Sequence, residues 1–172
     1  GSLDNFDWRL SIATVCHDGL FSDFSGYQRN LVLIEGQGIS LAHDSQRIDV
    51  LENCLDIASF DGGCKTVGKL TSDTIKDFNV ITKIDKVEPQ VNSYVGSKQV
   101  QVELYNNDFC FAYSLTDEMV VQALNAHVNV VPVGHLAKLS INKKESQAKP
   151  LAVTFTGKNM IIVQLKTIEN GR

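Results

Sequence analysis

Residues 26–38, GYQRNLVLIEGQG, place an arginine inside an aliphatic segment that alternates like a β-strand. Successive side chains of a strand point to opposite faces. One face of this strand therefore carries Tyr27, Arg29, Leu31 and Leu33. An arginine on such a face is either an edge residue whose head group reaches water or a buried cation that needs an anionic partner. The sequence leaves both interpretations open.

Length and charge limit the classes of protein to consider. The chain has 172 residues and 43% hydrophobic content, which is sufficient for a real interior. It carries 16 basic and 20 acidic residues, and its densest basic cluster is Lys143–Lys144. A partner with a phosphate backbone requires a basic surface, so we expect no nucleic-acid partner.

The apolar runs are a few residues long, far below the roughly 20 that span a bilayer, so we expect no membrane segment. We also expect no signal peptide, because no basic region precedes an apolar stretch. The four cysteines show no CxxC spacing, which is typical of a reduced, cytoplasmic protein.

Segments with period two recur along the whole chain and predict an all-β protein, a sandwich, jelly roll or barrel. In the first half we expect strands at 8–15, 29–35, 38–43, 54–59, 65–70 and 77–84. In the second half we expect one hairpin that joins 99–104 to 109–113 and another that joins 151–155 to 160–168. The single helical candidate is 117–124. We expect one domain over 1–172, with a pseudo-boundary near 86–89.

Motifs for several kinds of chemistry are absent from the sequence. It contains no G-x-S-x-G elbow, GxGxxG turn or P-loop. No two of its histidines have the spacing of a metal site; they are His17, His43, His127 and His135. We therefore expect no metal, no cofactor and no catalytic residue.

The segment NLVLIEGQG has the shape of the first motif of cupin barrels, a strand followed by Glu35 and a Gly-x-Gly turn. In metal cupins two histidines precede this strand, where Tyr27 and Arg29 stand here. Four motifs in order make the chain similar to the HutD/Ves family of small bacterial cupin-like proteins: FDWRLSIATV at 6–15, DGLFSDFSGYQRNLVLIEGQG at 18–38, FDGG at 60–63 and DFNVIT at 77–82. The resemblance implies an RmlC-like cupin architecture without a catalytic metal.

HutD-type members are associated with histidine utilisation and are thought to bind an intermediate such as urocanate or formylglutamate, whereas Ves-type members are linked to stress responses. The family normally has a further strand ahead of the segment at 6–15, and this sequence begins after that point. It also often has Pro at the place of Ser25 and Asp at the place of Gln28.

The resemblance implies that Arg29 lines a ligand pocket. A guanidinium on an apolar strand face is costly unless a carboxylate meets it, which favours a ligand carboxylate on independent grounds. The alternative is that Arg29 only holds two strands together, through Asp77 or Glu35.

Other candidates for ligand binding share strand faces with apolar residues. Asp77 and Asn79 lie on the face opposite Phe78, which is a cavity wall or a strand edge. Three aromatic residues are either core residues or ligand platforms: Trp8, Tyr27 and Phe60. Arg9 lies on the face opposite Trp8, so we expect it to be solvated or to pair across strands.

Together these features predict a metal-free, non-enzymatic cupin-like protein that binds a small anionic metabolite and serves histidine utilisation or a stress response. One rival is an isomerase or lyase that acts on a carboxylated substrate, with Asp77 or His17 as its base. Another is an interaction module with a vestigial cavity, whose strand edges form a homodimer or dock a partner.

Overall fold

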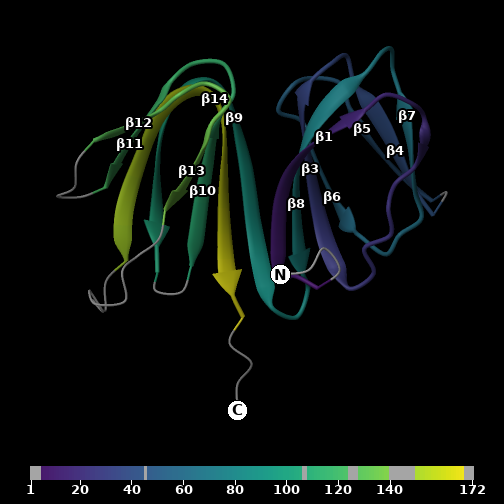
Figure 1. Cartoon of the computed structure of the whole chain (residues 1–172), viewed down its shortest axis with the longest axis horizontal. Helices are drawn as coiled ribbons and strands as arrows, with labels where there is room; N and C mark the ends of the chain where they lie inside the picture. The colour runs from purple at the N-terminus through teal and green to yellow at the C-terminus, as the bar shows by residue number, and fades with distance from the viewer. Residues whose placement is uncertain (1–4, 45, 106–107, 124–127, 140–149, 169–172) are drawn as a thin grey trace. The chain divides into compact units, whose positions relative to one another are not determined.

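The computed structural model describes residues 5–44, 46–105, 108–123, 128–139 and 150–168. The regular structure of these ranges consists of β-strands, coloured along the chain in Figure 1. The chain forms two compact units, which divide after Val87 and again after Thr167. Within the described ranges, no helix is long and apolar enough to span a bilayer.

The first unit contains two four-stranded antiparallel sheets, with the strand orders β1-β8-β3-β6 and β2-β7-β4-β5. Its strands are β1 (Trp8–Val15), β2 (Gly19–Leu20), β3 (Tyr27–Glu35), β4 (Ile39–His43), β5 (Arg47–Leu51), β6 (Ile57–Asp61), β7 (Thr66–Leu70) and β8 (Ile75–Lys83). Strand β3 is central to the first sheet because β8 and β6 pair with its two edges.

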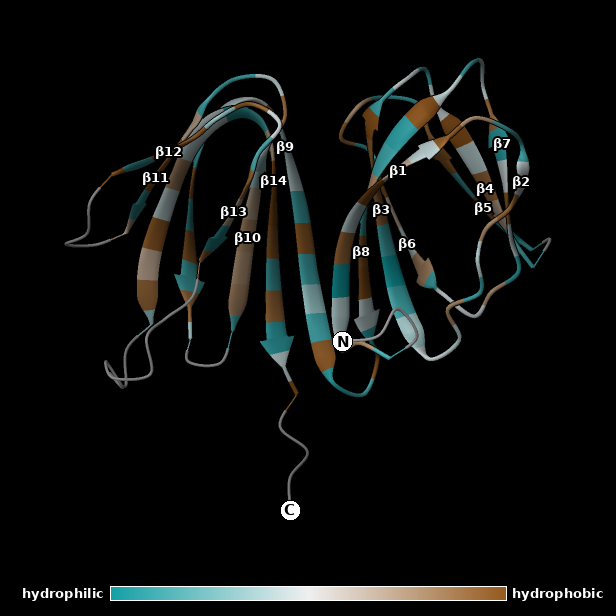
Figure 2. Ribbon diagram, in the orientation of Figure 1, coloured by the Kyte–Doolittle hydropathy of each residue, from teal (hydrophilic) through white to brown (hydrophobic). Residues whose placement is uncertain are grey.

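The second unit is one six-stranded sheet in the order β12-β11-β14-β10-β13, in which β9 also pairs with β14. Its strands are β9 (Val87–Leu104), β10 (Phe109–Ser114), β11 (Met119–Ala123), β12 (Asn129–Val131), β13 (Leu136–Leu139) and β14 (Leu151–Thr167). The hydropathy of β9 alternates along the strand, as Figure 2 shows. The core of the second unit contains buried side chains such as Phe155, Met160 and Cys110.

The face of β3 that carries Arg29 also carries Leu31 and Leu33, as the alternation predicts. Both leucines have no exposed surface and pack with Ile39 and Leu41 of β4 in the core of the first unit. The turn that follows β3 needs glycine because Gly36 has φ 107°. The segment with the cupin-like sequence thus forms the strand and turn that its residues predict.

Three predictions for the second half are wrong. Strands β9 and β10 do not form the expected hairpin; both pair with β14. Residues 151–168 are not a hairpin either, since Leu151–Thr167 is one continuous strand. The expected helix at 117–124 is strand β11, which pairs with β12 and β14, while residue 124 lies outside the described ranges. In each case pairing with distant strands outweighs the local turn or helix signal.

In the first half, the strand expected at 54–59 lies at Ile57–Asp61, and strand β5 was not expected. The apolar side chains of β5, Ile48 and Val50, are 65% and 57% exposed. The other face carries Arg47, Asp49 and the buried Leu51. Arg47 and Asp49 form an ion pair with 2.8 Å between Nη2 and Oδ2. Because the apolar residues of β5 fall on both faces, the strand shows no simple alternation of buried apolar residues.

Candidate functional site

Arg29 lies in the middle of the inner face of the first sheet. Strand β8 places Ile81 opposite Arg29, and β1 places Arg9 opposite the same Ile81. Partners in an antiparallel register project to the same side, so Arg9 and Arg29 share this face. The Arg29 side chain is buried, with only 5% exposed.

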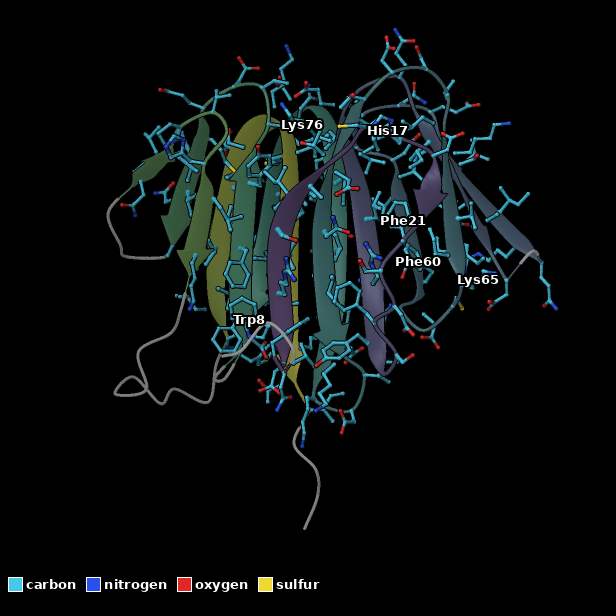
Figure 3. All side chains as sticks on the ribbon, turned by 45° about the vertical axis from the view of Figure 1, so that its right-hand side comes forward. Trp8, His17, Phe21, Phe60, Lys65 and Lys76 are labelled. Atoms are coloured by element: carbon cyan, nitrogen blue, oxygen red, sulfur yellow. The ribbon has the colours of Figure 1, made fainter. Side chains whose placement is uncertain are left out.

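Three phenyl rings surround the guanidinium of Arg29. Its Cζ atom lies 5.2 Å from the ring centroid of Phe21, 5.4 Å from that of Phe24 and 5.3 Å from that of Phe60. These distances are within the range of cation–π attraction. Phe21 comes close because residue 68 is glycine; a Cβ there would lie 2.5 Å from the Phe21 ring. Figure 3 shows Phe21 and Phe60 near each other.

Asn79 links Arg29 to Asp77. Nη2 of Arg29 donates a hydrogen bond to Oδ1 of Asn79 over 2.9 Å, and Nδ2 of Asn79 donates to Oδ1 of Asp77. The amide orientation follows from chemistry, because the guanidinium only donates and the carboxylate only accepts. Glu35, the other acid expected beside Arg29, pairs instead with Lys76 at 2.7 Å between Oε2 and Nζ. Among the residues that the structure describes, Arg29 is therefore linked to an acid through an amide and not directly.

This bridge leaves two buried polar atoms without a hydrogen-bond partner in the described part of the chain. They are Nε of Arg29, a donor, and Oδ2 of Asp77, an acceptor. Nη1 of Arg29 donates a long hydrogen bond to the backbone carbonyl oxygen of Ser22, over 3.5 Å. Each unpartnered buried group costs about 1 to 3 kcal/mol, and more when it is charged. Each such group calls for an explanation, and a ligand that completes the hydrogen bonds is one.

Burial sets the proton affinity of both charged groups. It raises the pKa of Asp77 to about 6, although the Arg29 charge, the Asn79 hydrogen bond and the nearby backbone N–H of Ala13 act in the opposite direction. Burial also lowers the pKa of Arg29; the charge of Asp77 opposes this effect and that of Arg9 adds to it. Asp77 thus titrates close to physiological pH, within reach of acid–base chemistry.

A pocket of about 460 Å³ opens over this network, a volume typical of small-molecule sites. Residues Arg29, Asn79 and Asp77 line its inner wall together with Phe21 and Phe24. The remaining lining residues are Ala13, Thr14, Val15, Cys16, His17, Gly19, Leu20 and Ser22. The pocket therefore combines an apolar wall with a charged network of three residues.

The other predicted site residues occupy different places. The Phe60 ring contacts the guanidinium of Arg29 and packs against the His43 ring, with 4.5 Å between the two ring centroids. Tyr27 packs against Phe24, which in turn covers Arg29. Neither ring is among the lining residues, so both support the site from outside the pocket.

Trp8 faces away from the pocket. It pairs with Thr82, whereas the neighbouring Arg9 shares the face of Arg29. Trp8 and His17 lie at opposite ends of β1 in Figure 3, and only His17 lines the pocket. The structure therefore brings three of the six predicted residues together in the pocket wall: Arg29, Asn79 and Asp77.

Two residues of the site, Phe21 and Phe24, were not predicted from the sequence. Phe21 and Phe24 belong to the segment FSDFSGYQR, and their spacing beside the arginine was the available signal. Arg9 was expected to be solvated or to pair across strands, whereas it is half-buried and its charge acts on Arg29.

The structure also shows what surrounds the potential metal ligands. Within the described residues, no group of three or more His, Cys, Asp or Glu side chains is arranged to hold a metal ion. His43 is occupied, with Nδ1 2.9 Å from Oγ1 of Thr66 and Nε2 3.2 Å from Oδ2 of Asp49. His127 lies outside the described ranges.

Comparison with known proteins places these features in context. The family model described as HutD matches residues 1–160. A 21.2 kDa protein of the hutC 3′ region in Pseudomonas putida is 31% identical over 132 residues. This match covers 77% of the chain and 63% of the relative's own length.

Solved structures agree with the fold. HutD from Pseudomonas fluorescens SBW25 superposes with a TM-score of 0.78 at 25% identity, over 98% of this chain and 84% of that one. A cupin 2 conserved barrel domain protein from Leptotrichia buccalis gives a TM-score of 0.57 at 11% identity, over 94% and 84% of the two chains. The latter likeness concerns the fold alone, and it confirms the prediction of an all-β, cupin-like chain.

Proposed function

Because the chain belongs to the HutD family of cupin-like proteins, we propose that it is a metal-free binding protein whose pocket holds a small carboxylate on Arg29. One observation carries this proposal. Arg29 is buried in a pocket wall, yet among the described residues it has no direct carboxylate partner and its Nε is unpartnered.

A ligand carboxylate would supply what the site lacks. A carboxylate binds a guanidinium through two parallel hydrogen bonds, and Nε is one of the donors that take part in such a pair. The three phenyl rings keep water from competing for the cation and strengthen the attraction. Arg9 adds positive charge on the same face. The proposal thus explains why Arg29, whose charge is costly to bury, lies on an apolar strand face.

We propose that the ligand is an intermediate of histidine degradation, such as urocanate or formylglutamate, which the protein senses or sequesters in the regulation of histidine utilisation. The name of the Pseudomonas putida relative, which refers to the hutC 3′ region, supports this choice. The pocket volume of about 460 Å³ suits molecules of this size.

A thermal-shift screen of histidine, urocanate, formylglutamate and glutamate tests the proposal, with Cys16 as a reporter of the site. Cys16 and Cys54 are both exposed, but only Cys16 lines the pocket. We expect a compound that raises the melting temperature also to slow the alkylation of Cys16 and to leave that of Cys54 unchanged. Mass spectrometry of the alkylated peptides measures both rates in one sample.

The result that contradicts this assignment is stabilisation without any protection of Cys16, because the ligand would then bind elsewhere. The variant Lys76→Gln is a suitable control. Lys76 lies on β8 beside Asp77 but pairs with the exposed Glu35 outside the pocket. It should keep the full response to the ligand.

A second function is favoured by one observation. Asp77, with its pKa raised to about 6, lines the same pocket as His17, which is the combination that an isomerase or lyase would use as base and acid. Incubation of the four compounds with the protein, followed by proton NMR, separates the two functions. We expect the compounds to be recovered unchanged; conversion that is lost in Asp77→Asn would establish the enzyme.

A further inference from the structure

The pocket wall contains two unpartnered atoms of opposite hydrogen-bonding character. Nε of Arg29 is a donor, and Oδ2 of Asp77 is an acceptor whenever the carboxyl group is ionised. Both residues line the same pocket, and both are more than nine-tenths buried, with 5% and 1% of their surface exposed.

Strand register explains why these two groups do not satisfy each other. Arg29 of β3 lies opposite Ile81 of β8. Asp77 precedes Ile81 by four residues in β8 and lies opposite Leu33. At about 3.3 Å per residue their backbones are offset by roughly 13 Å along the strand. Asn79 fills the interval and uses one atom of each neighbour, Nη2 of Arg29 and Oδ1 of Asp77. Nε of Arg29 and Oδ2 of Asp77 remain available to a ligand.

We propose that the pocket selects carboxylates that also carry an N–H or O–H donor, with the carboxylate on Arg29 and the donor on Oδ2 of Asp77. This inference rests on the proposed function, because it assigns the second contact of the same ligand. Both atoms are enclosed in the structure, so neighbouring side chains must move for a ligand to reach them. The half-buried rings of Phe21 and Phe24 lie over the guanidinium. Amino acids, N-acylamino acids and imidazole carboxylates meet the requirement, whereas simple carboxylates do not.

Two pairs of probes of similar shape isolate the donor. Glutamate and glutarate share two carboxylates, but only glutamate has an N–H donor. Urocanate and cinnamate share an acrylate, but only urocanate has a ring N–H. A hydrogen bond to a charged group contributes about 1.5 to 3 kcal/mol, so calorimetry should find the donor-bearing member bound roughly 10- to 100-fold more tightly.

Asp77→Asn provides the sharper test because it changes the hydrogen-bonding character with little change of shape. The new amide oxygen should face Nδ2 of Asn79, as Oδ1 of Asp77 does, so that the new NH₂ group takes the place of Oδ2. The pocket then offers a donor where it offered an acceptor. We expect the preference for glutamate over glutarate to reverse, because the ammonium group of glutamate would then meet a donor. Urocanate should be weakened less, since its neutral imidazole can present its acceptor nitrogen to the new NH₂ group. Lys76→Gln should keep the original preference.

The outcomes separate this inference from the proposed function. Equal affinities within both pairs, or a preference for glutamate over glutarate that Asp77→Asn leaves unchanged, would overturn the donor requirement and leave the carboxylate site on Arg29 in place. Failure of all four probes to bind, or affinities that Arg29→Ala does not reduce, would overturn the proposed function and the donor requirement with it.

Discussion

Between pH 4 and pH 7 the unsubstituted chain should lose about 3 kcal/mol of unfolding free energy that the Asp77→Asn variant does not lose. Burial raises the pKa of Asp77 from 3.8 to about 6. Between these two values the folded state binds more protons than the unfolded state, so stability falls as the pH rises. The shift of about two units, at about 1.4 kcal/mol each, gives the expected magnitude. The asparagine carries no charge and has no such cost.

Urea denaturation of both proteins at pH 4, 5, 6 and 7 measures this difference. Other titrating groups are common to the two proteins, so their contributions cancel in the comparison. The difference should grow mainly between pH 4 and pH 6 and level off above pH 7. Parallel stability curves over this range would show that Asp77 is not held in a site that disfavours its charge.

Arg29→Ala should abolish the stabilisation that a bound carboxylate gives. A ligand present at roughly 100 times its dissociation constant stabilises the folded state by about 2.7 kcal/mol. For a chain of this size, the melting temperature should rise by roughly 5 to 10 °C. Thermal melts with and without formylglutamate or urocanate measure the shift in both proteins. Lys76→Gln should keep the full shift, since its side chain pairs with Glu35.

The stability of the Arg29→Ala protein without ligand separates a binding role from a purely structural one. We expect it to remain folded, because Asp77 keeps its hydrogen bond from Asn79 and takes up a proton when the neighbouring cation is removed. A structural cation would behave differently, since breaking a buried ion pair costs about 3 to 5 kcal/mol. A loss of that size together with an unchanged ligand shift would reject the pocket role of Arg29.

Alternation along single strands was sufficient to predict the class of fold and the central strand β3. It placed Arg29, Leu31 and Leu33 on one face, and the structure confirms this arrangement. Pairing between strands was less accessible. Residues 156–159 look like a turn, yet Asn159 adopts φ 52° within β14 and accepts a hydrogen bond from the backbone of Gly96 over 2.8 Å. Local sequence patterns do not predict such long-range contacts.

The same limit applies to the site. Alternation identified Asp77 and Asn79 as partners on one face of β8, but it did not show that Asn79 would stand between Arg29 and Asp77. That geometry depends on the register of β3 against β8. The rings of Phe21 and Phe24 reach Arg29 from a segment that has no strand periodicity. Side chains on such segments are placed by tertiary contacts, which a single sequence does not reveal.

The hydrogen bond from Nε of Arg29 to a ligand carboxylate is the central claim, and NMR of the arginine Nε–H groups observes it directly. The Arg29 signal is assigned as the one lost in Arg29→Lys, and the probe is the compound that stabilises the protein most among histidine, urocanate, formylglutamate and glutamate. We predict that saturation moves the Arg29 Nε–H resonance downfield, because this group has no partner among the described residues. Stabilisation by the compound with an unmoved Arg29 Nε–H resonance would contradict the account.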